Sequence, residues 1–271
     1  MNGIIEMLSY PFASRAIIAG ILISLCGALL GVNLVLKRFS MLGDGLSHVA
    51  FGAAAVALAV GAAPLQISIP VVVVAAFALL RLRDSGKMRG DAAIALVSSG
   101  SLAIGIIVAS LTTGMNTDIN NYMFGSILAL SKSDVIAAVI LAAVVLTLYC
   151  LFYRNIFACT FDEGFARASG VGVGFYNSLI AVLTAVTVVI GMRIMGALLI
   201  SSIMTFPALS SMRVCKHYKT VVITSAAVSV AAFMTGLMLS FAYDMPAGAS
   251  VVVVNLAIFI VMATVGKIKE R

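Results

Sequence analysis

Long apolar runs recur along the whole chain, and they constrain its fold more than any other feature. They have the length of roughly 17–25 residues that a transmembrane helix needs, whereas the strands of a membrane barrel alternate over about 10 residues. The chain is 62% hydrophobic and only 10% charged, while soluble domains carry about 25% charged residues. Too little polar surface remains to cover a soluble globule, so the sequence predicts an all-α polytopic membrane protein.

We expect eight or nine transmembrane helices within a single membrane domain that covers residues 1–271. The first apolar run is long enough to span and is followed by others, so it indicates a membrane helix rather than a cleaved signal peptide. The second and third spans are short and joined by a tight turn. If they pack together without crossing fully, the count falls to eight. The nine predicted spans are 14–36, 47–63, 65–81, 91–111, 134–153, 176–192, 194–212, 221–243 and 250–267.

The basic residues are distributed unevenly between the connections of these spans. All but three of the 17 lysines and arginines fall on one predicted side of the membrane. The exceptions are Arg15, Lys132 and Arg193. Because basic connections stay in the cytoplasm, we expect an extracytoplasmic N-terminus and a cytoplasmic C-terminus. The net charge of +7 is explained by residues that flank the membrane, so it indicates lipid rather than nucleic acid as the partner of these cations.

Asp44 and His48 place a carboxylate and an imidazole one helical turn apart, so their side chains share one face, about 5–6 Å apart at Cβ. An ionisable pair in an apolar context is by default a functional-site hypothesis. Oxygen and imidazole ligands together suit Zn²⁺, Mn²⁺ or Fe²⁺. The alternative is that Asp44 caps the second span while His48 lies at the interface. Ser47 is a candidate support for the pair, unless its hydroxyl bonds back to a helix carbonyl.

Residues 160–175 form the most polar segment on the predicted cytoplasmic side. Asp162 and Glu163 favour the N-terminus of a helix, and Gly170 suits its end. We therefore expect a short helix across the cytoplasmic face that carries Phe161 and Phe165 and offers a surface to a partner. The alternative is an amphipathic connector that only joins two spans.

Charges are also expected near the outer mouth of the bundle. Asp134 lies outside in this arrangement and raises the local concentration of cations there. Arg193 opposes the entry of a cation unless it is paired, and the expected arrangement is that its guanidinium snorkels to the interface. Residues 112–133 contain an apolar stretch that is too short to cross, which predicts an extracellular or half-inserted helix shielded by protein.

Five stretches occur in order along this hydropathy profile and carry a family resemblance. They are Gly43–His48, Phe124–Leu128, Asp162–Gly170, Gly196–Ala208 and Asp244–Gly248. Together they resemble the membrane permeases of bacterial ABC importers for zinc, manganese and iron, the ABC-3 group, over nearly the whole chain. The chain departs from that family at Gly45, where alanine is usual, and at Arg193, where a neutral residue is more frequent.

The resemblance implies the ABC importer permease fold and a homodimer in the bacterial plasma membrane. It further implies an ATP-binding subunit on the cytoplasmic face and an extracytoplasmic metal-binding protein. Two copies of the Asp44–His48 pair would then meet on the dimer axis and bind the transported ion, with no permanently bound cofactor. The segment at residues 160–175 would dock the ATP-binding subunit through an apolar anchor, Phe165, with charges near its rim. The implied coupling residues are Asp162, Glu163, Phe165, Arg167 and Gly170.

The sequence lacks the phosphate-binding pattern G-x-x-x-x-G-K-[ST], so we do not expect this chain to hydrolyse ATP by that route or to be an enzyme. Two other functions remain open at this stage. One is a secondary metal transporter driven by protons, which would need no partner. The other is an intramembrane metalloenzyme, which would need more ligands and a base, and neither HExxH nor GxSxG occurs. Nothing in the chain favours one of zinc, manganese and iron over the others.

Overall fold

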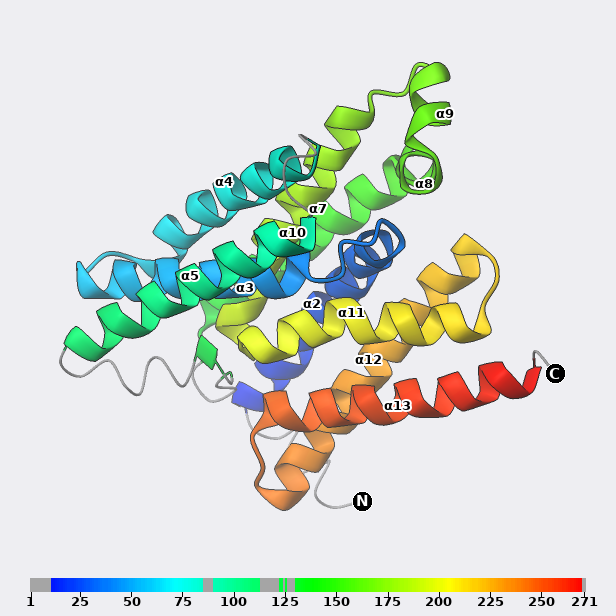
Figure 1. Cartoon of the computed structure of the whole chain (residues 1–271). Helices are drawn as coiled ribbons and strands as arrows, with labels where there is room; N and C mark the ends of the chain where they lie inside the picture. The colour runs from blue at the N-terminus through cyan, green and yellow to red at the C-terminus, as the bar shows by residue number, and fades with distance from the viewer. Residues whose placement is uncertain (1–10, 85–89, 113–121, 124, 126–129, 270–271) are drawn as a thin grey trace.

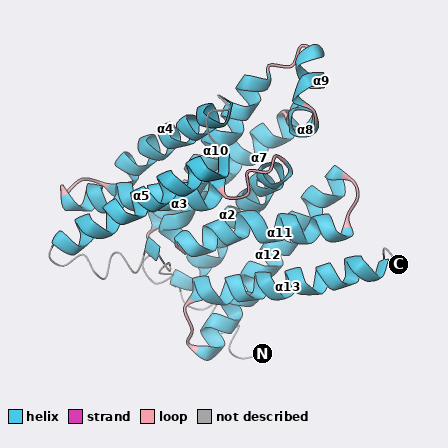
Figure 2. Cartoon of the chain, in the orientation of Figure 1, coloured by secondary structure: helices cyan, strands magenta, loops and turns pink. Residues whose placement is uncertain are grey.

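The computed structural model describes residues 11–84, 90–112, 122–123, 125 and 130–269, and these ranges form a bundle of helices (Figures 1 and 2). Within them Figure 2 shows helices and connecting loops only, which confirms the all-α fold class. The helices are α2 (Pro11–Leu36), α3 (Leu42–Ala59), α4 (Pro64–Asp84), α5 (Gly90–Leu111), α7 (Lys132–Leu151), α8 (Tyr153–Phe161), α9 (Glu163–Ala168), α10 (Val173–Met195), α11 (Ala197–Val214), α12 (Tyr218–Tyr243) and α13 (Ala247–Lys269).

Nine helices in the described ranges are long and apolar enough to cross a membrane, which favours nine spans over eight. The second of them, α3, contains 18 residues, which corresponds to a length of about 27 Å. It begins at Leu42, five positions before the predicted start of the second span at residue 47. This shift matters for the site, because it places Asp44 in the same helix as His48 rather than in the connection before it.

The centre of the bundle is formed by α2 and α3. α2 contacts α7, α10, α11 and α12, while α3 contacts α4, α5, α10 and α11. The outer helices α4, α5 and α13 expose large apolar side chains such as Val74, Leu96 and Ile260. An apolar exterior around a packed interior is the arrangement that a bundle surrounded by lipid or by a second subunit requires.

Two glycines allow the central helices to approach their neighbours at backbone distance. A Cβ atom on Gly31 of α2 would lie 1.9 Å from the carbonyl oxygen of Met204 on α11. A Cβ atom on Gly52 of α3 would lie 2.6 Å from the carbonyl oxygen of Ser101 on α5. Small residues at such crossings are typical of helix packing in membranes, where close van der Waals contact drives association.

Several basic segments gather toward one end of the bundle. The connection between α2 and α3, the helices α8 and α9, the connection between α11 and α12, and the C-terminal end of α13 all lie toward the right in Figure 1. These segments include Arg38, Arg167, Lys216 and Lys267. The arrangement agrees with the alternation of charge on which the predicted orientation depends.

The opposite end contains a sharp break between α10 and α11. The helices are separated by Gly196 alone, whose φ of 89° lies in the left-handed region. Gly125, with φ of 79°, lies against this break, and a Cβ atom there would meet the carbonyl oxygen of Met195 at 2.3 Å. The predicted extracellular segment at 112–133 lies largely outside the described residues, as does most of the stretch Phe124–Leu128.

Candidate functional site

Asp44 lies in the first turn of α3 rather than at its cap. The N-cap residue is Met41, and no side chain caps it, while the N–H of Gly45 donates to the carbonyl oxygen of Met41 at 2.9 Å. The structure therefore does not show the alternative arrangement, in which Asp44 is itself the cap of this helix. A carboxylate within the first turn is still stabilised by the positive end of the helix dipole, and its oxygens remain available to a ligand.

The neighbours of Asp44 show where its side chain points. A Cβ atom on Gly43 would lie 3.0 Å from the Sδ of Met204 on α11, and one on Gly45 would lie 2.6 Å from the Cγ2 of Ile94 on α5. Because successive residues of a helix are rotated by about 100°, Asp44 points outward between α5 and α11. Its side chain is 51% exposed.

His48 lies on the same face, one turn further along α3. Its Nε2 is 3.7 Å from the Oδ2 of Asp44, and its side chain is 24% exposed. An ion with tetrahedral bonds of 2.0–2.2 Å holds neighbouring ligand atoms about 3.4 Å apart. The two side chains are therefore already close to the separation at which one divalent ion can bind both.

The hydroxyl of Ser47 bonds back to a helix carbonyl, which was the alternative to a supporting role for the pair. Its hydroxyl donates to the backbone carbonyl oxygen of Asp44 at 2.7 Å, and its side chain is fully buried. It bonds to the backbone of the turn that carries the carboxylate, not to the side chains of the pair. Such a bond satisfies a polar group locally in an apolar environment.

The pair is an incomplete metal site within one chain. Among the described residues, no group of three or more His, Cys, Asp or Glu side chains is arranged to hold a metal. Asp44 and His48 offer two carboxylate oxygens and one imidazole nitrogen, whereas a structural zinc site takes four protein ligands. Such a set suits an ion that is bound transiently, or a site that another chain completes.

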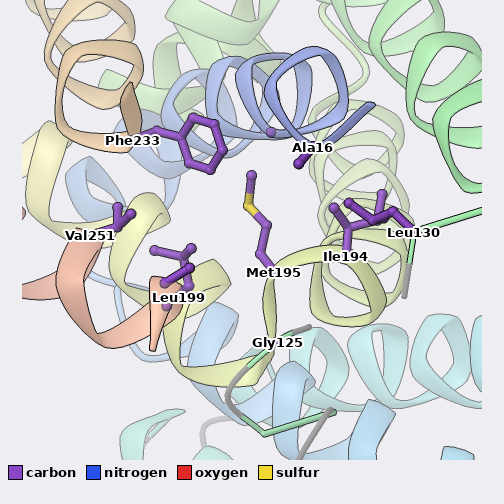
Figure 3. Close-up of a pocket in the computed structure, with 11 residues that line it drawn as sticks. Ala16, Gly125, Leu130, Ile194, Met195, Leu199, Phe233 and Val251 are labelled. Atoms are coloured by element: carbon purple, nitrogen blue, oxygen red, sulfur yellow. The ribbon is translucent and has the colours of Figure 1, made fainter. Parts of the chain in front are cut away.

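A cavity elsewhere in the bundle has none of this chemistry (Figure 3). It lies near the break between α10 and α11, and the side chain of Met195 extends into it between Phe233 and Ile194. Every residue that lines it is apolar or glycine. Its lining includes no carboxylate or imidazole, so it lacks the ligand types of the Asp44–His48 pair.

The segment at residues 160–175 contains the predicted short helix. α9 begins at Glu163, and its N-cap Asp162 accepts a hydrogen bond from the N–H of Phe165 at 2.9 Å. The chain turns at Gly170, whose φ is 78°. The helix therefore starts and ends where the acidic pair and the glycine predicted. The Asp162 side chain caps the N-terminus, and Gly170 adopts the left-handed conformation that follows a helix end.

The side chains of α9 point in two directions. Phe165 is 68% exposed, and Arg167 is also exposed. Ala166 is fully buried and packs with Cys159 of α8 and Val173 of α10. An exposed aromatic on a short, capped helix is what a docking surface would present.

Glu163 is not at the rim of this surface, contrary to the expectation. Its Oε1 lies 3.1 Å from the Nζ of Lys37 at the end of α2, and it accepts a hydrogen bond of 3.1 Å from the Nδ2 of Asn177 on α10. Arg167 approaches the other oxygen of Glu163 only at 4.0 Å. The carboxylate therefore joins α9 to the bundle. Neither Lys37 nor Asn177 was a candidate from the sequence.

Arg193 is paired and does not simply extend to the interface. Its Nε lies 2.9 Å from the Oδ1 of Asp134, whose side chain is 6% exposed. Asp134 also accepts hydrogen bonds from Ser131 in a capping box at the start of α7. Its charge is therefore balanced by the guanidinium, and the expectation that Asp134 concentrates cations is not supported by this geometry.

Comparison with known proteins gives three consistent findings. The sequence pattern of the ABC 3 transport family matches residues 9–266. The chain is 28% identical over 245 residues to the high-affinity zinc uptake system membrane protein ZnuB of Haemophilus influenzae, covering 90% of this chain and 94% of that protein. It is 27% identical over 252 residues to the manganese import system permease protein ScaB of Streptococcus gordonii, covering 93% and 90%.

A solved structure shares the architecture. The chain superposes on one chain of PsaBC from Streptococcus pneumoniae, solved in complex with a Fab, with a TM-score of 0.86 and 26% sequence identity. The match covers 96% of this chain and 94% of that one. It confirms, along almost the whole chain, the fold that the five sequence stretches implied.

Proposed function

We propose that this chain, which belongs to the ABC 3 transport family, is the membrane subunit of an ATP-driven importer of divalent transition-metal ions. The observation that carries the proposal is the Asp44–His48 pair, two metal-ligand side chains 3.7 Å apart on an accessible face of α3. Relatives of similar length are named for zinc uptake and manganese import. The ion is cargo, bound in transit and released, and not a resident cofactor.

Two copies of the chain would complete the site. In the homodimer that we propose, two carboxylates and two imidazoles meet at the two-fold axis and supply four side-chain ligands, enough for a tetrahedral ion. The exposure of Asp44 between α5 and α11 is compatible with such an axis. Alternating access would then expose this shared site first to one side of the membrane and then to the other.

The energy source and the metal donor are other chains. A separate ATP-binding subunit docks on the cytoplasmic face, where α9 presents Phe165, and an extracytoplasmic metal-binding protein delivers the ion. The proposed orientation, with the N-terminus outside and the C-terminus in the cytoplasm of a bacterial cell, puts α8, α9 and most basic residues on the ATP-binding side.

Metal binding and uptake by site variants test the function. We expect Asp44→Asn and His48→Ala to abolish uptake of Zn²⁺ and Mn²⁺ by the complete transporter in proteoliposomes. Mass spectrometry should detect bound metal in the purified wild-type dimer and only background metal in both variants. Asp244→Asn is the matched control, since it removes an exposed carboxylate at the C-cap of α12 and keeps a residue type that tolerates the left-handed conformation.

Two results would contradict the proposal. Uptake at the wild-type rate in both site variants would show that Asp44 and His48 do not bind the ion. Uptake by the chain alone, without the ATP-binding subunit and driven by a proton gradient, would instead indicate a secondary transporter.

A further inference from the structure

The C-terminal end of α2 carries two polar side chains that connect it to three other spans, α7, α10 and α12, and to α8 and α9. Asn33 and Lys37 are separated by four positions, so they lie on one face of the helix. Asn33 is fully buried, and Lys37 is only 9% exposed. Polar groups buried this deeply are retained where their hydrogen bonds are satisfied, and both have partners from distant parts of the chain.

Asn33 is the centre of a buried hydrogen-bond network. Its Nδ2 donates to the hydroxyl of Tyr149 on α7 at 3.1 Å, and its Oδ1 accepts from the hydroxyl of Tyr218 on α12 at 2.7 Å. The two tyrosine oxygens lie 2.8 Å apart. Thr160 of α8 also donates to the Oδ1 of Asn33, at 3.2 Å. The network thus fixes α8 to three spanning helices.

Lys37, one turn further along, forms the second connection. Its Nζ lies 3.1 Å from the Oε1 of Glu163 on α9 and also donates to the Oδ1 of Asn177 on α10. Asn177 in turn donates to Glu163, so the three side chains form a closed triangle. A charged pair in such a site is directional, because moving either partner leaves a poorly solvated charge.

The chain from Lys37 to Asp44 is a short elbow in which the N–H groups of Lys37, Arg38, Phe39 and Leu42 make backbone hydrogen bonds. The N–H of Arg38 donates to Val35 and that of Phe39 to Leu34, which is the arrangement of a Schellman motif with a hydrophobic residue, Phe39, packed after it. Arg38 has a φ of 60°, which is uncommon for a residue with a Cβ atom.

The elbow leads directly into the site. The N–H of Leu42, the first residue of α3, donates to the carbonyl oxygen of Phe39. Lys37 precedes Asp44 by only seven positions, and backbone hydrogen bonds from Arg38, Phe39 and Leu42 lie between them. A displacement of α9 is therefore transmitted to the first turn of α3 through few rotatable bonds.

We propose that Lys37 is a positioning residue through which the α8–α9 segment acts on the Asp44–His48 pair, a proposal that rests on the proposed transport function. When the ATP-binding subunit moves α9, Glu163 displaces Lys37 and the elbow, and the carboxylate of Asp44 shifts relative to its ligand partners. The contacts of Ala166 with Cys159 and Val173 are apolar and non-directional, so they are less suited to setting the position of one side chain.

The test measures how nucleotide changes metal affinity in the assembled transporter. Coupling between two sites changes affinity by roughly 5–150-fold in typical allosteric proteins. We expect the wild-type complex to show a Zn²⁺ affinity ratio in that range between its nucleotide-free and ATP-trapped states. In the double variant Lys37→Met with Glu163→Gln, which removes the link without leaving an unpaired buried charge, the ratio should fall to about one, and less Zn²⁺ should be imported per ATP hydrolysed.

Two further variants isolate the link. Lys216→Met removes an exposed cation from the α11–α12 connection and should keep the wild-type ratio. The charge-swapped variant, Lys37→Glu with Glu163→Lys, should regain part of the ratio because the attraction is restored.

The outcomes separate this inference from the function on which it rests. If the double variant shows the same Zn²⁺ affinity ratio as the wild-type complex, the role of Lys37 is overturned and the transport function is left intact. The same conclusion follows if the wild-type complex itself shows a ratio of about one. A double variant that folds but no longer retains the ATP-binding subunit assigns the link to docking, which also contradicts the inference. Unchanged Zn²⁺ binding by Asp44→Asn would instead overturn the proposed function.

Discussion

The guanidinium of Arg193, in the last turn of α10, lies 2.9 Å from the nearly buried carboxylate of Asp134 at the start of α7. The contact holds the start of α7 against the end of α10, beside the break at Gly196. It also explains how the positive charge of Arg193 is tolerated at this end of a bundle proposed to admit metal ions. Without Asp134, the same guanidinium would raise the local positive potential and oppose entry of a divalent ion.

Removing Arg193 should therefore destabilise the protein more than removing an exposed cation nearby. Loss of one partner of a buried ion pair costs about 3–5 kcal/mol. Because Arg193 is 34% exposed, water replaces part of its interaction, and we expect about 1–3 kcal/mol for Arg193→Met. Thermal unfolding in detergent measures the effect. Lys132→Met, next to the same helix start but exposed, is the control, and equal losses in both variants would contradict the prediction.

Gly45 should be sensitive to the smallest enlargement. A Cβ atom there would lie 2.6 Å from the Cγ2 of Ile94, so Gly45→Ala forces α3 and α5 apart or displaces Ile94. Overpacking of this kind costs about 1–3 kcal/mol. We expect Gly45→Ala to lower the unfolding temperature and to weaken metal binding, because Asp44 is the adjacent residue.

A compensating change distinguishes crowding from a loss of helix flexibility. Ile94→Leu removes the branch at Cβ that carries Cγ2, so it should restore much of the stability lost in Gly45→Ala. The double-mutant cycle should show a favourable coupling energy of roughly 0.5 kcal/mol or more. Additive effects of the two substitutions would mean that the Ile94 side chain is not the obstacle.

The thiol of Cys159 on α8 offers a probe of how α9 is packed. Burial raises the pKa of this thiol above its ordinary value, and Lys37 opposes the shift only partly. The neutral thiol is therefore favoured in the folded protein, so the thiolate that reacts with alkylating reagents forms only at higher pH. In a protein with Cys26, Cys150 and Cys215 replaced by alanine, the midpoint of alkylation rate against pH should lie above about 8.5. A midpoint at or below that of the denatured chain would contradict the burial of Cys159.

Accessibility of introduced cysteines should establish the orientation. In a cysteine-free background, Met245→Cys, in the turn between α12 and α13, should react with an impermeant reagent applied to intact cells. Lys216→Cys, between α11 and α12, should react only after the membrane is opened. The expectation follows from the concentration of basic residues on the Lys216 side, and the reverse pattern would invert the proposed topology.

The spans were predictable because each requires a long apolar run, but the start of α3 was not. The predicted second span started at residue 47, which put Asp44 in the connection before it and the polar residues Ser47 and His48 in its first turn. Inside the helix these groups are accommodated individually: Asp44 is exposed, and Ser47 donates to the backbone. Hydropathy is averaged over a window and does not detect how individual polar side chains are accommodated. The start predicted from hydropathy is therefore later than the true start of the helix.

The partners of Glu163 and Arg193 lay beyond sequence reasoning for a different reason. Lys37 and Glu163 are 126 positions apart, and their contact depends on how α2, α9 and α10 pack. Local patterns predicted correctly that Asp162 starts a helix and that Gly170 ends it, because capping involves only neighbouring residues. The partner of a charged side chain on that helix, such as Glu163, is decided by tertiary packing.

The exposed face of α9 should dock the ATP-binding subunit through Phe165. Aromatic anchors at the centre of an interface commonly contribute about 2 kcal/mol or more to binding, while charges at the rim contribute less. Phe165→Asp places a carboxylate in that contact and should reduce co-purification of the ATP-binding subunit and abolish metal-stimulated ATP hydrolysis. Phe165→Leu keeps an apolar side chain and should retain most of both. Since Phe165 is 68% exposed within the chain, neither substitution should lower the unfolding temperature of the membrane subunit alone. Normal subunit retention and normal stimulated hydrolysis in Phe165→Asp would exclude this face of α9 as the docking surface.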